Sequence, residues 1–227
     1  MKLSNFKKIS GDASFRIFYR TKKSVLIFCK KDKKINLEIY DAINKILNRN
    51  KIRAPLLISN HYSQNFIEIE DFGDQTIFKF LKKNKKKQLY IYKKILIIIN
   101  KIQKIKKINI STFLGNNYTV PKYDNKKILK EANLFIQWFL PRVLKNSNKN
   151  LSKKLKKIFI NLIKKIEIKK RVFVHRDFHI SNLIKHKNSI VLIDNQDAQM
   201  GHVAYDLASL IDDVRYKTST KFKNQLF

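Results

Sequence analysis

Short runs of alternating apolar and polar residues occupy the first part of the chain. Over residues 7–30 the apolar side chains fall at every second position in two series: Phe15, Ile17, Tyr19, and then Val25, Ile27, Cys29. A period of two places successive side chains on opposite faces of a sheet. The pattern therefore predicts an antiparallel pair of strands, and residues 56–59 and 66–69 predict two more around a turn at 61–64.

One segment within this region has helical spacing instead. Residues 35–50 carry apolar side chains three or four positions apart: Leu37, Tyr40, Ile43, Ile46, Leu47. We expect an amphipathic helix that packs this stripe on the sheet. Glu38 lies on the same helix, where it either pairs with a cation of a binding site or, more simply, is a solvated charge.

Helical periodicity dominates after residue 72. Helices are predicted over residues 88–107, 126–144 and 151–168, and Pro141 is expected to kink or end the second of them. In the first of these helices the predicted buried side comprises Leu89, Tyr92, Leu96 and Ile99. The lysine runs at 82–87 are expected to be a solvated loop. The chain thus predicts an α+β fold, a small antiparallel sheet followed by a mostly helical part.

Polar residues with catalytic potential lie between two apolar runs in the last third of the chain. Residues 172–174 and 189–193 predict buried strands, with a hairpin-like break at 187–188. Asp177 and Asn182 fall on the loop between them, and Asp194 falls at the end of the second strand. We expect these three side chains to converge.

Their chemistry matches phosphoryl transfer from ATP. That reaction uses one carboxylate to orient the acceptor hydroxyl, and an amide oxygen with a second carboxylate to hold Mg²⁺ against the phosphates. His-Arg-Asp, four further residues and then Asn, over 175–182, is the spacing of a kinase catalytic loop. The Asp-Phe-Gly sequence of protein kinases is absent, because Asp194 is followed by Asn195.

Six segments in order along the chain resemble the aminoglycoside phosphotransferase family, and most of all its anomeric amino-sugar kinases, which phosphorylate N-acetylmuramate and N-acetylglucosamine. They are residues 11–16, 70–74, 131–140, 175–182, 193–198 and 201–210. One short motif could arise by chance, whereas an ordered set is specific.

The resemblance implies a two-lobed, protein-kinase-like fold. Residues 1–71 would form the nucleotide-binding lobe and residues 72–227 the catalytic, mostly helical lobe, with ATP and Mg²⁺ in the cleft between them. By the same resemblance, the turn at 10–14 would cover the nucleotide phosphates and the segment at 70–74 would be the hinge that meets adenine. The residues expected to bind nucleotide are Gly11, Ser14, Arg16, Glu70 and Phe72. A phosphate-binding lysine cannot be assigned, because Phe28 stands at the aligned position and Lys30 is only the nearest candidate.

Roles in the catalytic loop follow from chemistry and resemblance together. Asp177 is expected to be the catalytic carboxylate, and Asn182 and Asp194 are expected to bind Mg²⁺. His179 has two interpretations, a structural hydrogen bond or a contact with the acceptor. Three residues are expected to support the loop structurally: His175, Asp197 and Asp206.

The helix at 126–144 offers candidates for the acceptor side. Glu131, Phe135 and Trp138 share one face of it, so the aromatic residues belong either to the core or, by resemblance, to the neighbourhood of the sugar. Glu131 and Trp138 are therefore candidate substrate-binding residues. Relatives continue with further helices beyond residues 205–210 that wall the sugar site, so part of the acceptor pocket is expected to be missing from this sequence.

Charge and composition qualify this interpretation. The formal net charge of +33 would ordinarily indicate nucleic acid or an anionic membrane as a partner. Lys far outnumbers Arg, however, and the lysines are scattered along the chain, which favours genomic A+T bias over a nucleic-acid-binding face. Cys29 is the sole cysteine, and neither a signal peptide nor a membrane span is apparent, so a cytoplasmic protein is expected. The oligomeric state is left undefined.

The sequence therefore predicts an ATP-dependent small-molecule kinase that phosphorylates a sugar hydroxyl. The expected acceptor is the anomeric hydroxyl of an N-acetyl amino sugar in peptidoglycan recycling. The alternatives are an aminoglycoside or other small alcohol as acceptor, or a protein without catalysis, namely a truncated relative or a basic nucleic-acid binder.

Overall fold

The computed structural model describes residues 6–9, 16–144, 149–166 and 170–226. Five antiparallel strands form its main sheet: β1 (Lys7–Ile9), β2 (Arg16–Arg20), β3 (Ser24–Cys29), β4 (Leu57–His61) and β5 (Phe66–Glu70). They lie side by side in the order β1-β2-β3-β5-β4. The predicted strand pairs are thereby confirmed, and the predicted turn at 61–64 contains one 3₁₀ turn, Tyr62–Gln64.

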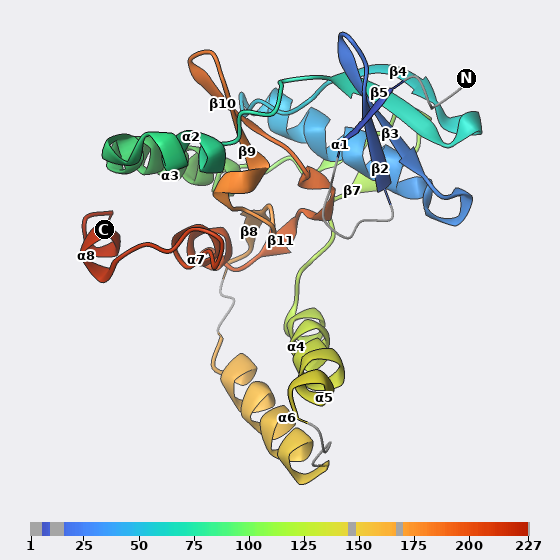
Figure 1. Cartoon of the computed structure of the whole chain (residues 1–227). Helices are drawn as coiled ribbons and strands as arrows, with labels where there is room; N and C mark the ends of the chain where they lie inside the picture. The colour runs from blue at the N-terminus through green and yellow to red at the C-terminus, as the bar shows by residue number, and fades with distance from the viewer. Residues whose placement is uncertain (1–5, 10–15, 145–148, 167–169, 227) are drawn as a thin grey trace.

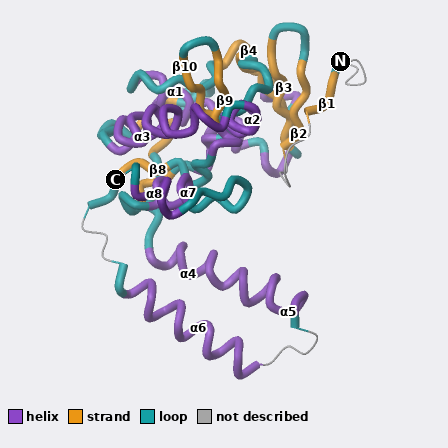
Figure 2. Tube along the Cα trace, turned by 60° about the vertical axis from the view of Figure 1, so that its left-hand side comes forward, coloured by secondary structure: helices purple, strands orange, loops and turns teal. Residues whose placement is uncertain are grey.

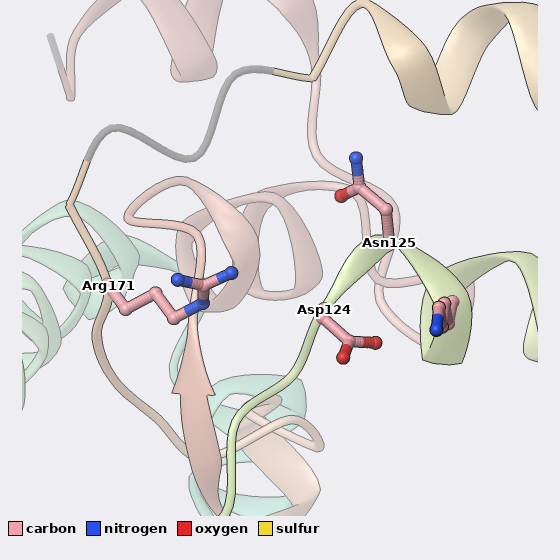
Figure 3. A pocket seen from close by; sticks show the side chains of 4 residues that line it. Asp124, Asn125 and Arg171 are labelled. Carbon is pink, nitrogen blue, oxygen red and sulfur yellow. The ribbon is translucent and has the colours of Figure 1, made fainter.

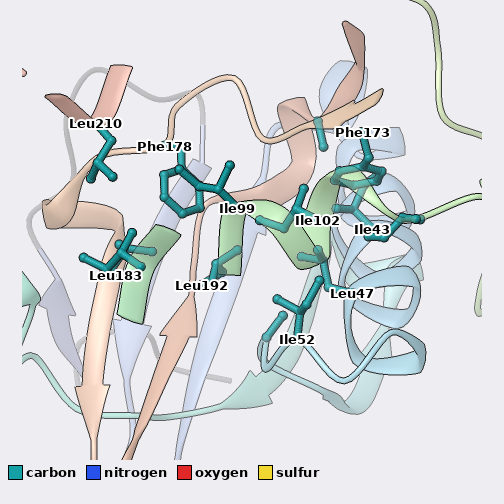
Figure 4. Packing of buried hydrophobic residues seen from close by; sticks show 14 of the residues in the cluster. Ile43, Leu47, Ile52, Ile99, Ile102, Phe173, Phe178, Leu183, Leu192 and Leu210 are labelled. Atoms are coloured by element: carbon teal, nitrogen blue, oxygen red, sulfur yellow. The ribbon is translucent and has the colours of Figure 1, made fainter. Parts of the chain in front are cut away.

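Helix α1 (Ile35–Arg49) packs against this sheet, as predicted, and it also has a second buried face (Figure 1). On the sheet side Leu37 and Tyr40 pack with Val25, Ile27 and Ile67. On the other side the helix joins the main core, whose members include Ile43, Leu47, Phe173, Phe178 and Leu192 (Figure 4). Because α1 is buried on both sides, it joins the sheet to the strands and loop over residues 172–192.

The two expectations for Glu38 on α1 were both wrong. Its carboxylate is buried and accepts hydrogen bonds from Thr112 Oγ1 at 2.9 Å and from Asn116 Nδ2 at 3.0 Å. These partners come from the loop between two short strands that the sequence did not predict, β6 (Asn109–Ser111) and β7 (Asn117–Thr119). A buried carboxylate requires such donors, and here they come from residues far along the chain.

The helical part begins with α2 (Ile77–Lys83) and α3 (Gln88–Gln103). The lysines at 82–87 are exposed as predicted, but the loop expected there was wrong, because Lys82 and Lys83 end α2 and Lys85–Lys87 form a 3₁₀ turn. The buried side of α3 differs in part from the prediction, since Leu89 and Leu96 are only half-buried. Apolar residues lie nearly all round α3, so periodicity alone cannot define one buried face. The residues that are buried on α3 are Ile91, Tyr92, Ile95, Ile99 and Ile102.

The helix predicted over 126–144 is interrupted where Pro141 predicted a kink or an end. It consists of α4 (Asn125–Leu134), a π-helical turn (Phe135–Phe139) and α5 (Leu140–Val143). Pro141 has no amide hydrogen to donate to the preceding turn, which accounts for the local change of hydrogen-bond pattern. Together with α6 (Lys149–Lys164), these helices form a hairpin that extends away from the rest of the molecule (Figures 1 and 2).

Four short strands frame the polar loop at 175–182: β8 (Val172–Val174), β9 (Leu183–His186), β10 (Ser189–Leu192) and β11 (Gln199–Gly201). The break predicted at 187–188 is confirmed, because β9 and β10 pair as a hairpin with Ser189 opposite His186. Strand β8 pairs with β11. A Cβ atom at Gly201 would lie 2.8 Å from Val174 Cγ2, so a larger residue there would require the buried Val174 side chain to shift.

Two helices complete the chain, α7 (Tyr205–Ile211) and α8 (Thr220–Asn224). Among the described residues, no helix combines the length and apolar character needed to cross a membrane. The main sheet ends at Glu70, next to the boundary expected at residue 71, and the division into two domains stays a prediction.

Candidate active site

Asp206 of α7 fixes the start of the loop at 175–182 by two hydrogen bonds. One carboxylate oxygen, Oδ2, accepts the His175 amide at 2.7 Å, and the other, Oδ1, accepts the Arg176 amide at 3.0 Å. Burial raises the pKa of Asp206, and the charge of His175 and these amides oppose that shift. Arg176 has a positive φ of 73°, a conformation that costs energy for a residue with a side chain. Asp206 therefore holds the chain in a conformation that it would not adopt alone.

Asp177 lies between two side chains of its own loop. Its Oδ1 is 3.1 Å from His179 Nε2, and its Oδ2 accepts a hydrogen bond of 2.8 Å from Asn182 Nδ2. The bond from His179 lowers the pKa of Asp177, while burial opposes that shift. Asp177 is therefore ionised at neutral pH, and because 46% of its side-chain surface is exposed, it is free to meet a hydroxyl group.

His179 itself is buried and turned toward Asp177. Its Nδ1 is buried and has no hydrogen-bond partner among the described residues. The ring therefore positions the Asp177 carboxylate, which favours a structural hydrogen bond as the role of His179. A contact between His179 and the acceptor stays a prediction.

The β9–β10 hairpin places the backbone of Asn182 beside that of Ile193, next to Asp194. The amide of Ile193 donates to the Asn182 carbonyl at 3.1 Å, which sets Asn182 opposite the residue just before Asp194. Asp194 has a φ of 62° and accepts a 3.0 Å hydrogen bond from Arg16 of β2. This backbone bond brings the loop beside the end of β10, and the convergence of the three side chains stays a prediction.

The donor set at this point suits Mg²⁺, which the family pattern implies. Asn182 and Asp194 offer amide and carboxylate oxygens, the hard ligands that Mg²⁺ prefers. Among the described residues there is no cluster of three or more His, Cys, Asp and Glu side chains for a metal. Mg²⁺ keeps water and phosphate oxygens in most of its coordination positions, so it needs few protein ligands.

The side chains of His175 and Asn195 are buried and bonded to each other. The sequence predicted a structural role for His175 and none for Asn195. His175 Nε2 lies 2.8 Å from Asn195 Oδ1 and 3.2 Å from the carbonyl of Ile193, and both of these are acceptors. Nε2 therefore carries the proton. Asn195 Nδ2 in turn donates to Asn44 Oδ1 on α1 at 2.8 Å. His175 has the structural surroundings expected of it, whereas Asn44 and Asn195 were missed.

Glu131 reaches the catalytic loop, although it comes from the helical hairpin. It accepts a 2.5 Å hydrogen bond from the Tyr123 hydroxyl and forms an ion pair with Arg176, the residue before Asp177. Trp138 lies in the π-helical turn with 62% of its surface exposed, and no contact described here joins it to the loop. The structure thus brings Glu131, one of the two candidates on this helix, to Arg176 of the loop.

Asp197 lies in the 3₁₀ turn Asn195–Asp197, which directly follows Asp194. Its carboxylate accepts a 2.7 Å hydrogen bond from Gln196 Nε2, and its carbonyl accepts a 3.4 Å bond from Arg176. These contacts link the turn to the catalytic loop.

The segment expected to be the hinge leaves the sheet after β5. Glu70 accepts a 3.0 Å hydrogen bond from the Leu56 amide, and Asp71 pairs with Arg20 at 2.6 Å. Phe72 is buried against Ile184 and Val191 of the β9–β10 hairpin. Glu70 and Phe72 therefore lie where the sheet meets the catalytic segments, while Gly11 and Ser14 fall outside the described residues.

A surface hollow of about 350 Å³ lies apart from this site, at the start of α4 (Figure 3). Asp124, Asn125, Lys126 and Arg171 line it. Asp124 caps α4 by accepting the Lys127 amide at 3.0 Å, so its polar atoms already have a structural use. None of the predicted site residues belongs to it.

Comparison with proteins of known sequence gives relatives of one kind. An N-acetylmuramate/N-acetylglucosamine kinase of Neisseria meningitidis is 26% identical over 223 residues, covering 94% of this chain and 63% of the relative. The enzyme of the same name from Pseudomonas putida is 26% identical, covering 90% of this chain and 58% of the relative. The chain thus spans less than two thirds of the length of these relatives.

Comparison with solved structures gives the fold. An aminoglycoside phosphotransferase in complex with gentamicin superposes with a TM-score of 0.72 at 17% identity, covering 97% of this chain and 74% of that one. An ADP-bound aminoglycoside phosphotransferase superposes with a TM-score of 0.69 at 16% identity, covering 100% and 77%. The predicted kinase-like α+β fold is confirmed. The sequence profile of the phosphotransferase enzyme family matches residues 5–227, and the chain therefore belongs to that family.

Proposed function

We propose that this chain transfers the γ-phosphate of ATP to a hydroxyl group of a small sugar, with Mg²⁺ as cofactor. The acceptor we propose is the anomeric hydroxyl of an N-acetyl amino sugar. Family membership and the names of the relatives support this proposal. The observation that carries it is the state of Asp177, which is ionised, partly exposed and fixed by His179 and Asn182.

In the proposed mechanism Asp177 accepts the proton of the acceptor hydroxyl and aligns that oxygen with the γ-phosphorus. His179 and Asn182 hold the carboxylate from its two oxygens, so it does not have to reorganise when the acceptor arrives. Asn182 and Asp194 would hold Mg²⁺, which would supply positive charge to the phosphates. Asp206 and Asn195 each bond to His175, so they fix the loop relative to α7 and to the turn that follows Asp194.

Adenine would bind at the hinge, against backbone groups near Glu70 and Phe72. Phe72 forms a buried apolar cluster with Ile184 and Val191 at that segment. Gly11 and Ser14 are proposed to cover the phosphates. On the acceptor side, Glu131 is the better supported candidate because it is paired with Arg176 next to Asp177, and His179 and Trp138 remain proposals.

A panel of acceptors tests this function by coupled release of ADP. We expect the highest kcat/KM with N-acetylmuramate or N-acetylglucosamine, and much lower values with gentamicin and choline. The 1-O-methyl glycoside of N-acetylglucosamine is the matched control, because only its anomeric hydroxyl is blocked. Equal turnover of this glycoside would refute anomeric transfer, and ADP release with none of the acceptors would refute the kinase assignment.

A further inference from the structure

The residue directly before Asp177 has a backbone conformation that favours glycine, yet it is an arginine. Arg176 has a φ of 73°, which glycine adopts without the energetic cost that a side chain brings. Its amide bonds to Asp206, a contact that the backbone of any residue other than proline could make. An arginine at this position therefore indicates a use for its side chain.

The guanidinium of Arg176 is held by three other segments of the chain. It forms an ion pair with Glu131 of α4, and its carbon Cζ lies 4.4 Å from the centre of the Tyr123 ring. Its Nη1 also donates to the carbonyl of Asp197 at 3.4 Å. Only 16% of the side chain is exposed, so these contacts hold it in one place.

The partners of Arg176 are themselves fixed. Tyr123 is buried, and its hydroxyl donates to the other carboxylate oxygen of Glu131 at 2.5 Å. The ring of Tyr205 on α7 packs edge-on against Tyr123, with 5.3 Å between the ring centres. Asp206, the next residue of α7, accepts the Arg176 amide. Helix α7 thus supports both the backbone of Arg176 and the aromatic partner of its side chain.

We propose that Arg176 is a positioning residue that ties the catalytic loop to α4 through Glu131 and so fixes Asp177 against the acceptor hydroxyl. This inference rests on the proposed function. Arg176 and Glu131 are 45 positions apart in sequence, so their ion pair joins the helical hairpin to the loop. A displacement of α4 would move Arg176, and with it the carboxylate of the next residue.

Sugar-dependent release of ADP tests the role of Arg176, with kcat and KM measured separately. Arg176→Gln should lower kcat about 10- to 100-fold, the loss expected from a small misplacement of a reacting group. The KM for ATP should change little. Arg176→Lys keeps a charge that can pair with Glu131 and should retain more of the activity. Arg171→Gln, which removes an exposed arginine next to β8, is the matched control and should match the wild type.

A double-mutant cycle in kcat tests the connection to α4. Glu131→Gln removes the other half of the ion pair, so Arg176→Gln combined with Glu131→Gln should lower kcat by much less than the product of the two single effects. If Glu131 acted on the acceptor alone, the two effects would multiply, and the proposed connection would be overturned.

Glycine separates a positioning role from a role of the charge itself. Arg176→Gly removes the guanidinium while the backbone keeps its positive φ without cost, so it provides the same test if Arg176→Gln does not fold. Added guanidine should not restore kcat to Arg176→Gly, because the free cation is not joined to the backbone beside Asp177. Recovery to the wild-type rate would overturn the assignment.

The failure of this inference can be told from that of the proposed function. A kcat of Arg176→Gln equal to that of the wild type would overturn the role of Arg176 and leave the kinase proposal intact. A wild type that releases no ADP with any sugar would overturn both.

Discussion

At the scale of single residues, the candidate site depends on what each imidazole and carboxylate is bonded to. His175 and His179 lie four positions apart in sequence, yet His175 bonds to Asn195 and His179 bonds to the oxygen of Asp177. The first supports the loop, and the second sets the ionisation of the carboxylate proposed to do the chemistry. Substitutions at the two positions should therefore have different effects.

His179→Leu should raise the pKa of Asp177. The bond from His179 is the main cause that lowers this pKa below 3.8, and burial, which raises it, would then act with less opposition. The measurement is a ¹³C NMR titration of the Asp177 carboxyl carbon, with Asp177→Asn to assign the signal. His61→Leu, which removes an imidazole on the main sheet, is the control and should leave the pKa unchanged.

The sign of the accompanying stability change follows from linkage. Because folding lowers the pKa of Asp177, its ionised form stabilises the wild type above about pH 4, and this contribution is lost as pH falls through the folded-state value. In His179→Leu that acid-dependent loss should be smaller. A pKa of Asp177 in His179→Leu that is unchanged from the wild type would contradict the account.

Sequence reasoning found residues whose spacing within one segment encodes their role, and missed those joined only by the fold. Asp177 and Asn182 are five positions apart, and their hydrogen bond fits one short loop. Asn44 and Asn195 are 151 positions apart, and in a chain rich in asparagine nothing marks either of them. The ion pair of Arg176 with Glu131, 45 positions away, was missed for the same reason.

At the scale of elements, α1 connects the sheet to the catalytic segments. Periodicity predicted the helix and its apolar stripe, but not that a second face would be buried against Phe173 and Leu192. On that face, Asn44 is buried and bonds to Asn195 Nδ2, and its own amide donates to the carbonyl of Pro55 at 2.9 Å. This polar contact within an apolar core fixes the position of α1 relative to the turn at 194–197.

A double-mutant cycle at Asn44 and Asn195 should show strong coupling in the free energy of unfolding. Each single change to Leu leaves a buried polar partner unsatisfied and should cost about 1–3 kcal/mol. The double variant should cost less than the sum, by roughly 0.5–3 kcal/mol. Urea unfolding monitored by circular dichroism measures all four proteins.

The matched control for this cycle is Asn44→Leu paired with Asn84→Leu, because the Asn84 side chain bonds to the carbonyl of Phe80 in α2, at 2.9 Å, and not to Asn44 or Asn195. That pair should be additive. Additivity between Asn44 and Asn195 as well would mean that their contact does not join the two elements.

At the scale of the whole molecule, the fold was predictable because the sheet, the catalytic loop and the helical part occur in the order of a known family. The arrangement of the helical hairpin was not predictable, since the sequence of α4 to α6 gives amphipathic helices without indicating what they pack against. Several large apolar residues of the hairpin are more than 40% exposed: Leu134, Phe135, Trp138, Phe139, Val143, Ile158 and Leu162.

The net charge of +33 raises a question that belongs to the molecule as a whole. Lysines are distributed over the exposed surface of many elements, including α3 and α6, and the fold is that of small-molecule phosphotransferases. Attraction to nucleic acid should therefore be non-specific, with a dissociation constant on the order of 10⁻⁴–10⁻⁶ M at physiological salt. The affinity should fall steeply as salt increases.

Fluorescence anisotropy with a labelled duplex and a labelled single strand, from about 50 to 200 mM salt, measures this prediction. The same oligonucleotides should not inhibit release of ADP at physiological salt. Nanomolar binding at physiological salt, or strong preference for one sequence, would favour the nucleic-acid-binding alternative.

The most direct test of the central claim is the rate of ADP release by wild type and Asp177→Asn with Mg-ATP and an N-acetyl amino sugar. If Asp177 takes the proton of the acceptor hydroxyl, kcat should fall about 10²- to 10⁴-fold in this variant. The KM for ATP should change little. Asp32→Asn, at a carboxylate with 68% of its side-chain surface exposed, should be as active as the wild type. Full activity of Asp177→Asn, or no sugar-dependent release of ADP by the wild type, would contradict the account.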